Sequence, residues 1–360
     1  MIPRLHTYWV KEFSKFFCMI QVLILVLFVI IDYLSRLDKF INSDLTLLGA
    51  FGYVLLKVPF MFIQITPAST LLATITVFSI MNRNNELLAV RSAGISVYFL
   101  VMPAVAAGLI LSGMLLLLGE TLVPVSMAKA NHIEHYEIKK SRHEIVAGRK
   151  DIWIKSDNRL VHIHYFDPVQ QTVSGITIST MDDAFLLSSR IDAKHGVYEN
   201  GYWRLTDVLE QRHAGKNPDY DVVQHTEKKI RAAFKPGDLE NIIKQSDEMS
   251  YYELKAYVAK VEREGYDAVT YRVDMYGKIA FPFVCIIMVL TGAATGMRSF
   301  AKENLPAAVA VGVVIAFVYW VMYGFCLSLG YGGILPPVVS AWVANLFFAC
   351  LGILYLVNTE

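Results

Sequence analysis

The sequence predicts an α-helical membrane protein with six transmembrane helices, three before and three after one inserted β domain. Hydrophobic residues make up 55% of the 360 residues and charged residues only 18%, and the mean hydropathy is +0.43. The charges are also segregated, because only ten of the 33 Lys and Arg and seven of the 32 Asp and Glu lie outside residues 120–278. Within that central block the apolar residues alternate with a period of two, which is typical of strands.

Uncharged stretches account for the six spans. A bilayer core about 30 Å thick is crossed by about 20 apolar residues in a helix. The last stretch is long enough for two spans, and the sequence GYGG at residues 330–333, followed by Pro336 and Pro337, divides it as a tight hairpin would. The uncharged stretches are residues 16–31, 58–82, 92–119, 279–297 and 304–359.

The basic residues of the short loops predict the orientation. Cytoplasmic loops of membrane proteins carry an excess of Lys and Arg. If the N-terminus is cytoplasmic, the short outer loops carry only Arg36 and Lys39, so both termini are expected in the cytoplasm and the central domain outside. The basic residues then assigned to the cytoplasmic side are Arg4, Lys11, Lys15, Arg83, Arg91, Arg298 and Lys302.

The outer domain is expected to begin as a polar helix over residues 120–144 and then to change to strands. Turn signals such as Asp167-Pro168 separate the alternating segments, which favours an antiparallel sandwich or barrel. Ser250 and Glu253 have capping-box spacing and predict a helix that ends near Arg263. The alternating segments are residues 151–155, 160–166, 175–181 and 202–206, and the predicted domains are residues 1–119, 120–270 and 271–360.

Several classes of function are excluded or disfavoured. The motifs G-x-x-x-x-G-K-[ST], G-x-S-x-G and H-E-x-x-H do not occur, so we expect no enzyme, no catalytic residue and no cofactor. The net charge is only +1, whereas nucleic-acid-binding proteins usually carry an excess of basic residues, so nucleic-acid binding is not expected. His132 and His135 have the spacing of half a metal site, but a solvated helix face explains them better, and the same holds for His162 and His164 on one strand. No metal site is therefore predicted.

The loop between the second and third spans contains a short amphipathic helix over about residues 83–92. On pattern alone it is either a solvated connecting turn or a docking helix whose apolar residues enter a groove on a cytoplasmic partner while its charges set the register. Its apolar residues include Leu87, Leu88 and Val90, its charged residues are Arg83, Glu86 and Arg91, and Gly94 is the expected terminator.

Ionisable residues at the outer end of the first span form the second candidate site. Arg36 and Lys39 are one helical turn apart and can present two cations to an anionic ligand, with Asp32 and Asp38 close in sequence. The alternative is interfacial snorkelling with local Asp–Arg pairing. Lys57, early in the second span, is open to the same two interpretations.

The loop sequence RNNELLAVRSAG at residues 83–94 resembles the signature of the LptF/LptG family of lipopolysaccharide export permeases. The segment MSYYEL at residues 249–254 and the glycine-rich turn before Pro336 and Pro337 are also similar to that family. The resemblance covers essentially the whole chain and is closer to the LptG type than to the LptF type.

This resemblance implies a permease subunit of an ABC transporter in the bacterial inner membrane, which exports lipopolysaccharide. The outer domain is then a periplasmic β-jellyroll. The implied partners are a second, LptF-like permease, a cytoplasmic LptB-like ATPase dimer that hydrolyses the ATP, a single-span LptC-like protein and a periplasmic bridge protein.

The resemblance also implies roles for individual residues. The loop helix, with Arg83, Glu86, Leu87, Arg91 and Gly94, corresponds to the coupling helix that receives the ATPase stroke. The lipid cavity is lined by the first and fifth spans, and its candidate residues are Arg36, Lys39, Asp32, Phe317 and Trp320. Lys39 matches a lysine of LptG-type proteins that contacts the phosphorylated head, whereas Asp32 stands where a further lysine is expected.

Two rival functions follow from other classes of membrane protein. A mechanotransmitting ABC permease acts on periplasmic partners without moving lipid through its own cavity, but such proteins usually have four spans. A membrane enzyme or assembly scaffold is the other rival, and an intramembrane enzyme is expected to show paired carboxylates or a histidine cluster within its spans.

Overall fold

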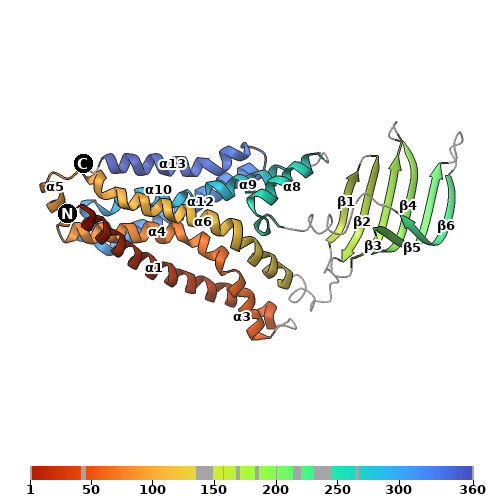
Figure 1. Ribbon diagram of the computed structural model, residues 1–360, viewed down its shortest axis with the longest axis horizontal. Coiled ribbons are helices and arrows are strands. Elements are labelled where there is room, and N and C mark those ends of the chain that lie inside the picture. The colour runs from red at the N-terminus through yellow and green to blue at the C-terminus, as the bar shows by residue number, and fades with distance from the viewer. Residues whose placement is uncertain are drawn as a thin grey trace. The chain divides into compact units, whose positions relative to one another are not determined.

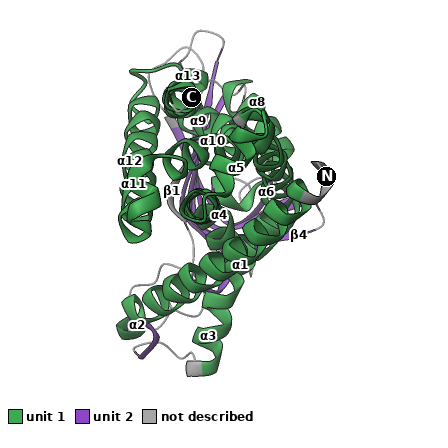
Figure 2. Ribbon diagram, turned by 90° about the vertical axis from the view of Figure 1, so that its left-hand side faces the viewer, with its two compact units in different colours: residues 1–38, 46–131, 246–360 green, residues 39–45, 132–245 purple. Residues whose placement is uncertain are grey.

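The structure is a computed structural model that describes residues 2–41, 46–134, 149–156, 158–167, 171–182, 186–199, 201–213, 220–230, 245–263 and 267–358. The chain divides into two compact units, coloured separately in Figure 2. The helical unit comprises Met1–Asp38, Thr46–Asn131 and Ser246–Glu360, and the β unit comprises Lys39–Leu45 and His132–Gln245.

The helices agree with the prediction of six membrane spans when one bent pair of helices is counted as a single span. Within the described residues, five helices are long and apolar enough to cross a bilayer: α1 (Ile2–Ser35), α4 (Val58–Arg83), α6 (Val97–Ile133), α12 (Leu305–Tyr331) and α13 (Pro337–Val357). The sixth span consists of α9 (Val269–Ala280) and α10 (Val284–Gly296), which are bent by 51° relative to each other. The shorter elements are α2 (Leu37–Ile41), α3 (Leu47–Leu56), α5 (Glu86–Ser92), the 3-10 helix η2 (Ser246–Glu248), α8 (Tyr251–Arg263) and α11 (Ser299–Glu303).

Helix α4 lies in the middle of the bundle, between α1, α10 and α12 (Figure 1). Two glycines one turn apart allow α10 to approach it closely. A Cβ atom on Gly296 would lie 2.8 Å from the Ile75 carbonyl oxygen and 2.8 Å from the Phe78 Cβ, and one on Gly292 would lie 2.9 Å from the Thr74 Cβ. Small residues at this spacing are the usual means by which membrane helices pack backbone to backbone.

The break between α9 and α10 is stabilised from two other helices. It contains Pro282, which interrupts the helical hydrogen bonds. The Asn345 amide nitrogen donates to the freed Ala280 carbonyl oxygen at 2.6 Å, and the Tyr319 hydroxyl donates to the Asn345 amide oxygen at 2.8 Å. Because both side chains are buried, they satisfy the backbone without water.

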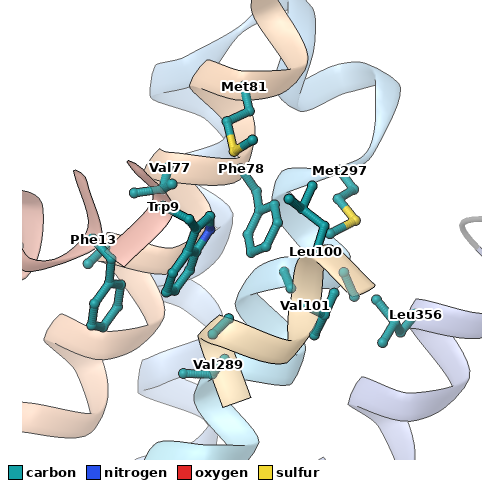
Figure 3. Close-up of a cluster of buried hydrophobic side chains, with 14 of the residues drawn as sticks. Trp9, Phe13, Val77, Phe78, Met81, Leu100, Val101, Val289, Met297 and Leu356 are labelled. Atoms are coloured by element: carbon teal, nitrogen blue, oxygen red, sulfur yellow. The ribbon is translucent and has the colours of Figure 1, made fainter. Parts of the chain in front are cut away.

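A buried apolar cluster joins the two halves of the helical unit. Figure 3 shows Trp9, Phe78, Leu100 and Leu356, which come from α1, α4, α6 and α13, gathered around one another. The Trp9 ring stacks on the Phe13 ring at a centroid distance of 5.0 Å. This cluster is called the inner core below.

The β unit contains the predicted strands. The strands that the structure describes form one antiparallel sheet in the order β1-β2-β3-β4-β5-β6, so each strand pairs with its neighbour in sequence. This is a meander, and the jellyroll arrangement stays a prediction. The strands are β1 (Arg149–Ser156), β2 (Arg159–Asp167), β3 (Thr172–Met181), β4 (Leu187–Glu199), β5 (Tyr202–His213) and β6 (Tyr220–Ile230).

The alternation of buried and exposed side chains changes phase part-way along the sheet. In β5, Trp203 and Leu205 are buried before Asp207, and Val208 is buried after it. Asp207 has a φ of 52°, and Gly175 in β3 has a φ of 67°, so both residues are in the left-handed region. A Cβ on Gly175 would lie 2.9 Å from the His164 Cβ. The strict period of two expected from the sequence therefore holds before and after Gly175 and Asp207 but not across these two residues.

Helices α6 and α8 come before and after the strands in the sequence, and both agree with the predicted helices as far as the structure describes them. Helix α6 continues the third span to Ile133, and the expected continuation to residue 144 lies beyond the described residues. The capping box is confirmed: the Ser250 amide donates to the Glu253 carboxylate at 2.9 Å, and the Glu253 amide donates to the Ser250 hydroxyl at 3.2 Å. The Glu120 carboxylate on α6 accepts the Tyr251 amide at 2.8 Å.

Candidate functional site

The C-terminal end of α1 carries a half-buried cluster of charges. The Lys57 ammonium lies 2.9 and 3.0 Å from the two carboxylate oxygens of Asp32. The Arg36 Nε lies 3.3 Å from the same carboxylate. Arg36 also donates to the hydroxyl of the buried Tyr53 at 2.8 Å. One carboxylate is thus shared by two cations: Arg36, which lies between α1 and α2, and Lys57, which lies between α3 and α4.

The aromatic ring of Tyr53 organises this cluster from α3. The Arg36 guanidinium and the Lys57 ammonium each lie 5.6 Å from the centroid of the ring. Because two cations surround one acid, Asp32, Arg36 and Lys57 together keep one formal positive charge. The local Asp–Arg pairing considered above is therefore present.

The other candidate residues of the lipid cavity are less enclosed. Lys39 lies on α2 and is exposed. Phe317 on α12 is 67% exposed. Trp320, one turn later, packs against Phe281 with their ring centroids 5.6 Å apart. Phe317 thus lies on an outward surface, whereas Trp320 contributes to the contact between α12 and the broken span.

The loop after α4 forms the predicted short helix, α5. It begins after Asn85, whose φ of 60° is left-handed, and it ends before Gly94, whose φ of 73° is also left-handed. Left-handed residues at both ends make α5 a separate helix rather than a continuation of α4 or α6. Gly94 is therefore the terminator expected from the sequence.

The two leucines of α5 have opposite environments. Leu87 is 5% exposed and belongs to the inner core, whereas Leu88 is 60% exposed. Leu87 anchors the helix to the bundle, and Leu88 is the apolar side chain that points outward. Arg83 and Arg91 are exposed as well. Sequence pattern alone placed both leucines on one apolar face, because a single turn of helix does not show which residue packs inward.

Glu86 is tied to its surroundings at the start of α5. The Tyr8 hydroxyl on α1 hydrogen-bonds to Glu86. The Asn84 amide nitrogen donates to the Glu86 Oε1 at 3.2 Å. The carboxylate therefore connects α5 to the first span as well as to its own loop.

Sequence reasoning missed two residues that hold this loop. The Asn82 amide nitrogen donates to the carbonyl oxygens of Met297 and Arg298, at 3.0 Å each. The Lys302 ammonium donates to the Asn85 amide oxygen at 2.8 Å. The one feature of the sequence that could have pointed to a role for Asn82 is its position as a polar amide at the end of an otherwise apolar span. Nothing in the sequence pattern connected residues more than 200 positions apart.

A second group of ionisable residues lies where α6, α8 and α9 meet. Lys278 on α9 is surrounded by the carboxylates of Asp247, Glu120, Asp274 and Glu253. Asp274 accepts a hydrogen bond of 2.6 Å from the Tyr331 hydroxyl on α12. Burial raises the pKa of the Asp247 carboxyl, and hydrogen bonds and the charge of Lys278 partly offset this effect. The hydrogen bond between Asp274 and Tyr331 joins α9 to α12.

The described residues contain no group of three or more His, Cys, Asp or Glu side chains that is suited to hold a metal ion. His132 is described, whereas His135 lies outside the described part of the chain. On β2, the His162 ring stacks on Trp153 with centroids 4.2 Å apart. The arrangement of His162 is thus that of a packed surface side chain.

Comparison with known proteins agrees with this architecture. A family model described as lipopolysaccharide export system permease LptF/LptG matches residues 7–358. The lipopolysaccharide export system permease protein LptG of Escherichia coli strain K12 is 22% identical to this chain over 332 residues, which cover 89% of this chain and 88% of that protein. LptG of Escherichia coli O6:H1 matches with the same identity and coverage.

The family match and the helices point to the same class of protein. A permease family is a family of transporters, and the apolar helices described above are those of a multi-pass membrane protein. The family model spans nearly the whole sequence, including α5 and the charged end of α1. We therefore assign this chain to the LptF/LptG family of lipopolysaccharide export system permeases.

Proposed function

We propose that this chain is the LptG-type permease subunit of an ABC transporter that extracts lipopolysaccharide from the inner membrane. The lipid is passed to a periplasmic bridge toward the outer membrane, and a separate cytoplasmic ATPase drives the process. The names of the two E. coli relatives support the subtype. The observation that carries the proposal is α5, which is anchored in the inner core by Leu87 and presents Leu88 outward.

The proposed orientation places α5 and both chain ends in the cytoplasm and the β unit in the periplasm. The excess of Lys and Arg in the short loops supports this orientation. The start of α1, the end of α13 and α5 lie at the same end of the bundle (Figure 1). Residues 1–119, 120–270 and 271–360 are the proposed N-terminal transmembrane half, periplasmic domain and C-terminal transmembrane half.

The proposed partners follow from the family. A second, LptF-like permease completes the membrane part, and an LptB-like ATPase dimer binds α5 through Leu88, Arg83 and Arg91. A single-span LptC-like protein and a periplasmic bridge protein receive the lipid. The sequence has no P-loop, which supports the assignment of ATP hydrolysis to a partner.

The proposed lipid site uses two chemically different surfaces. The acyl chains of the lipid lie against the outward faces of α1 and α12, which are the least buried of the long helices and include Phe317. Phosphates of the head group bind Arg36 and Lys39, because phosphate oxygens accept charge-assisted hydrogen bonds from such cations. Asp32 holds Arg36 in position and must be displaced in part when the phosphate arrives.

Co-purification in mild detergent, with mass spectrometry of the bound proteins and lipid, tests this function. We expect an ATPase, a second permease and lipopolysaccharide to accompany the chain. An ATPase without lipid would instead favour the mechanotransmitting permease. Recovery of a stable complex with neither ATPase nor lipid would contradict both functions.

The coupling role of α5 has its own test. Glu86→Ala removes the bond to Tyr8 on α1, so we expect the complex to assemble but to release less lipopolysaccharide for each ATP hydrolysed. Glu303→Gln, an exposed acid on α11, is the matched control. Unchanged release by Glu86→Ala in an intact complex would refute the role of Glu86.

A further inference from the structure

The second loop at the α5 end of the bundle, between α10 and α12, is attached to the first loop. Lys302 on α11 donates from its ammonium to the Asn85 side chain at 2.8 Å. Asn85 is the N-cap residue of α5, and the Ala89 amide donates to its main-chain oxygen at 3.0 Å. Its side chain does not cap α5, so the amide oxygen is available to the lysine. Lys302 therefore attaches α11 to the turn between α4 and α5.

A second attachment lies three residues earlier, on α4. The Asn82 amide nitrogen donates to the carbonyl oxygens of Met297, the C-cap residue of α10, and of Arg298, the residue before α11. The last carbonyl groups of a helix lack partners within the helix, so a side-chain donor there is a specific C-terminal cap. Asn82 thus joins the end of the second span to the end of the broken span.

Helix α11 is itself fixed to the C-terminal half. Ala301 is fully buried in a cluster with Leu71 of α4 and Ala308 of α12. Just before α11, the Arg298 guanidinium lies 4.2 Å from the centroid of the Tyr355 ring on α13. The segment from Arg298 to Lys302 therefore touches four helices of the unit: α4, α10, α12 and α13.

From this geometry we propose that α11 is a positioning element for α5, in which Asn82 and Lys302 fix α5 against the C-terminal half of the membrane unit. A displacement of α5 is then carried directly to the ends of α10 and α13. Without these bonds, α5 would be held by Leu87 and Tyr8 to the inner core and to α1. The link to an ATPase stroke rests on the proposed function, whereas the positioning of α5 does not.

The positioning is tested on the purified full-length chain by hydrogen–deuterium exchange of the α5 amides. Lys302→Met removes the donor, and Asn85→Gly removes the acceptor while glycine still adopts the left-handed conformation at no steric cost. Both variants are expected to accelerate exchange in α5 about threefold or more, whereas Lys302→Arg and Glu303→Gln leave it unchanged. Because Lys302 and Asn85 are exposed, these variants are expected to fold. Unchanged exchange in both variants would overturn the proposal.

The consequence for transport is tested on the complex reconstituted in lipid vesicles with lipopolysaccharide. Lys302→Met and Asn82→Ala are expected to lower the lipid released per ATP hydrolysed about threefold or more, with ATPase activity retained and with rescue by Lys302→Arg. Full coupling in both variants, despite faster exchange in α5, would overturn the transmitting role. If the wild-type complex released no lipid while the exchange results held, the proposed function would fail and the positioning of α5 would stand.

Discussion

The side chains of Lys57 and Asp32 form a two-point ion pair at the C-terminal end of the first span, with the ammonium 2.9 and 3.0 Å from the two carboxylate oxygens. Arg36 binds the same carboxylate, so the Asp32 side chain pairs with two cations. The side chains of Lys57 and Asp32 are only 13% and 18% exposed, which places the pair away from bulk water. Removal of Asp32 leaves two cations without their shared carboxylate, and removal of Lys57 leaves that carboxylate with Arg36 alone, in a place where solvent compensates the loss poorly.

Lys57→Met is expected to lower the free energy of unfolding by about 1–3 kcal/mol, because Asp32 loses its better-placed partner in a poorly solvated position. Thermal unfolding in detergent measures the change. Lys39→Met, on the exposed α2, is the control and is expected to alter stability by less than about 0.5 kcal/mol. Equal effects of the two substitutions would contradict the importance of the buried pair.

Asp32→Asn is expected to strengthen the retention of lipopolysaccharide, because the substitution removes the internal anion that competes for Arg36 and Lys57. The amount of lipid that remains bound after a salt wash, per mole of protein, gives the measurement. The gain should diminish as ionic strength rises, since salt screens charges in this partly exposed region. A loss of bound lipid would mean that Asp32 supports the site rather than competes for its cations.

Leu87→Ala and Leu88→Ala separate the anchoring side of α5 from its outward side. Leu87→Ala leaves a cavity in the inner core and is expected to cost about 2–5 kcal/mol of stability. Leu88→Ala is expected to leave the unfolding temperature unchanged and to weaken co-purification of the ATPase, because Leu88 is exposed. A reversal of these two outcomes would show that α5 presents its other face to the partner.

Gly296→Ala is expected to destabilise the contact between α4 and α10. The added Cβ would meet the Ile75 carbonyl oxygen at 2.8 Å, and a backbone atom within a packed helix does not move aside cheaply. Overpacking of this kind costs about 1–3 kcal/mol. Gly113→Ala, where no atom lies within 4 Å of the new Cβ, is the matched control in α6 and should be neutral or stabilising in thermal unfolding.

The β unit should lose stability in acid through Glu210. Burial alone would raise the pKa of this carboxyl, but hydrogen bonds and charges from Lys228 and Arg212 outweigh it and lower the pKa to about 2. Because the pKa is lower in the folded state than in the unfolded chain, the stabilisation is complete above about pH 4.5. It is lost as the pH falls toward 2, and it amounts to at most about 3 kcal/mol.

Thermal unfolding of the full-length chain, followed by circular dichroism of the β signal between pH 2 and 5, measures this dependence. Glu210→Gln is expected to flatten the pH profile in that range and to be less stable than the wild type at pH 7. Asp207→Asn is the control, since this more exposed acid on the same strand pairs with Lys194 at the surface. An unchanged profile for Glu210→Gln would place the acid sensitivity elsewhere.

The charged end of α1 shows where prediction from sequence reached its limit. Asp32, Arg36 and Lys57 were all recognised as ionisable groups at membrane depth, because such residues stand out in an apolar sequence. Local pairing of Asp32 with Arg36 was one of the two interpretations of the sequence. The sharing of Asp32 with Lys57 was not predicted, because it depends on how α3 brings Tyr53 close to both cations. The same applies to Asn82, whose partners lie 215 and 216 positions away.

Local patterns in the sequence were enough to predict the six spans, the loop helix that ends before Gly94, the capping box at Ser250 and the positions of several strands. Apolar length, capping chemistry and period-two alternation are local properties, so they can be recognised without knowledge of the packing. The packing of the helices establishes that Leu87 rather than Leu88 points inward, that Asp32 is shared by two cations, and that Lys302 reaches Asn85. Each of these depends on which helices lie side by side, and six apolar helices of similar composition can be arranged in many ways that the local pattern does not distinguish.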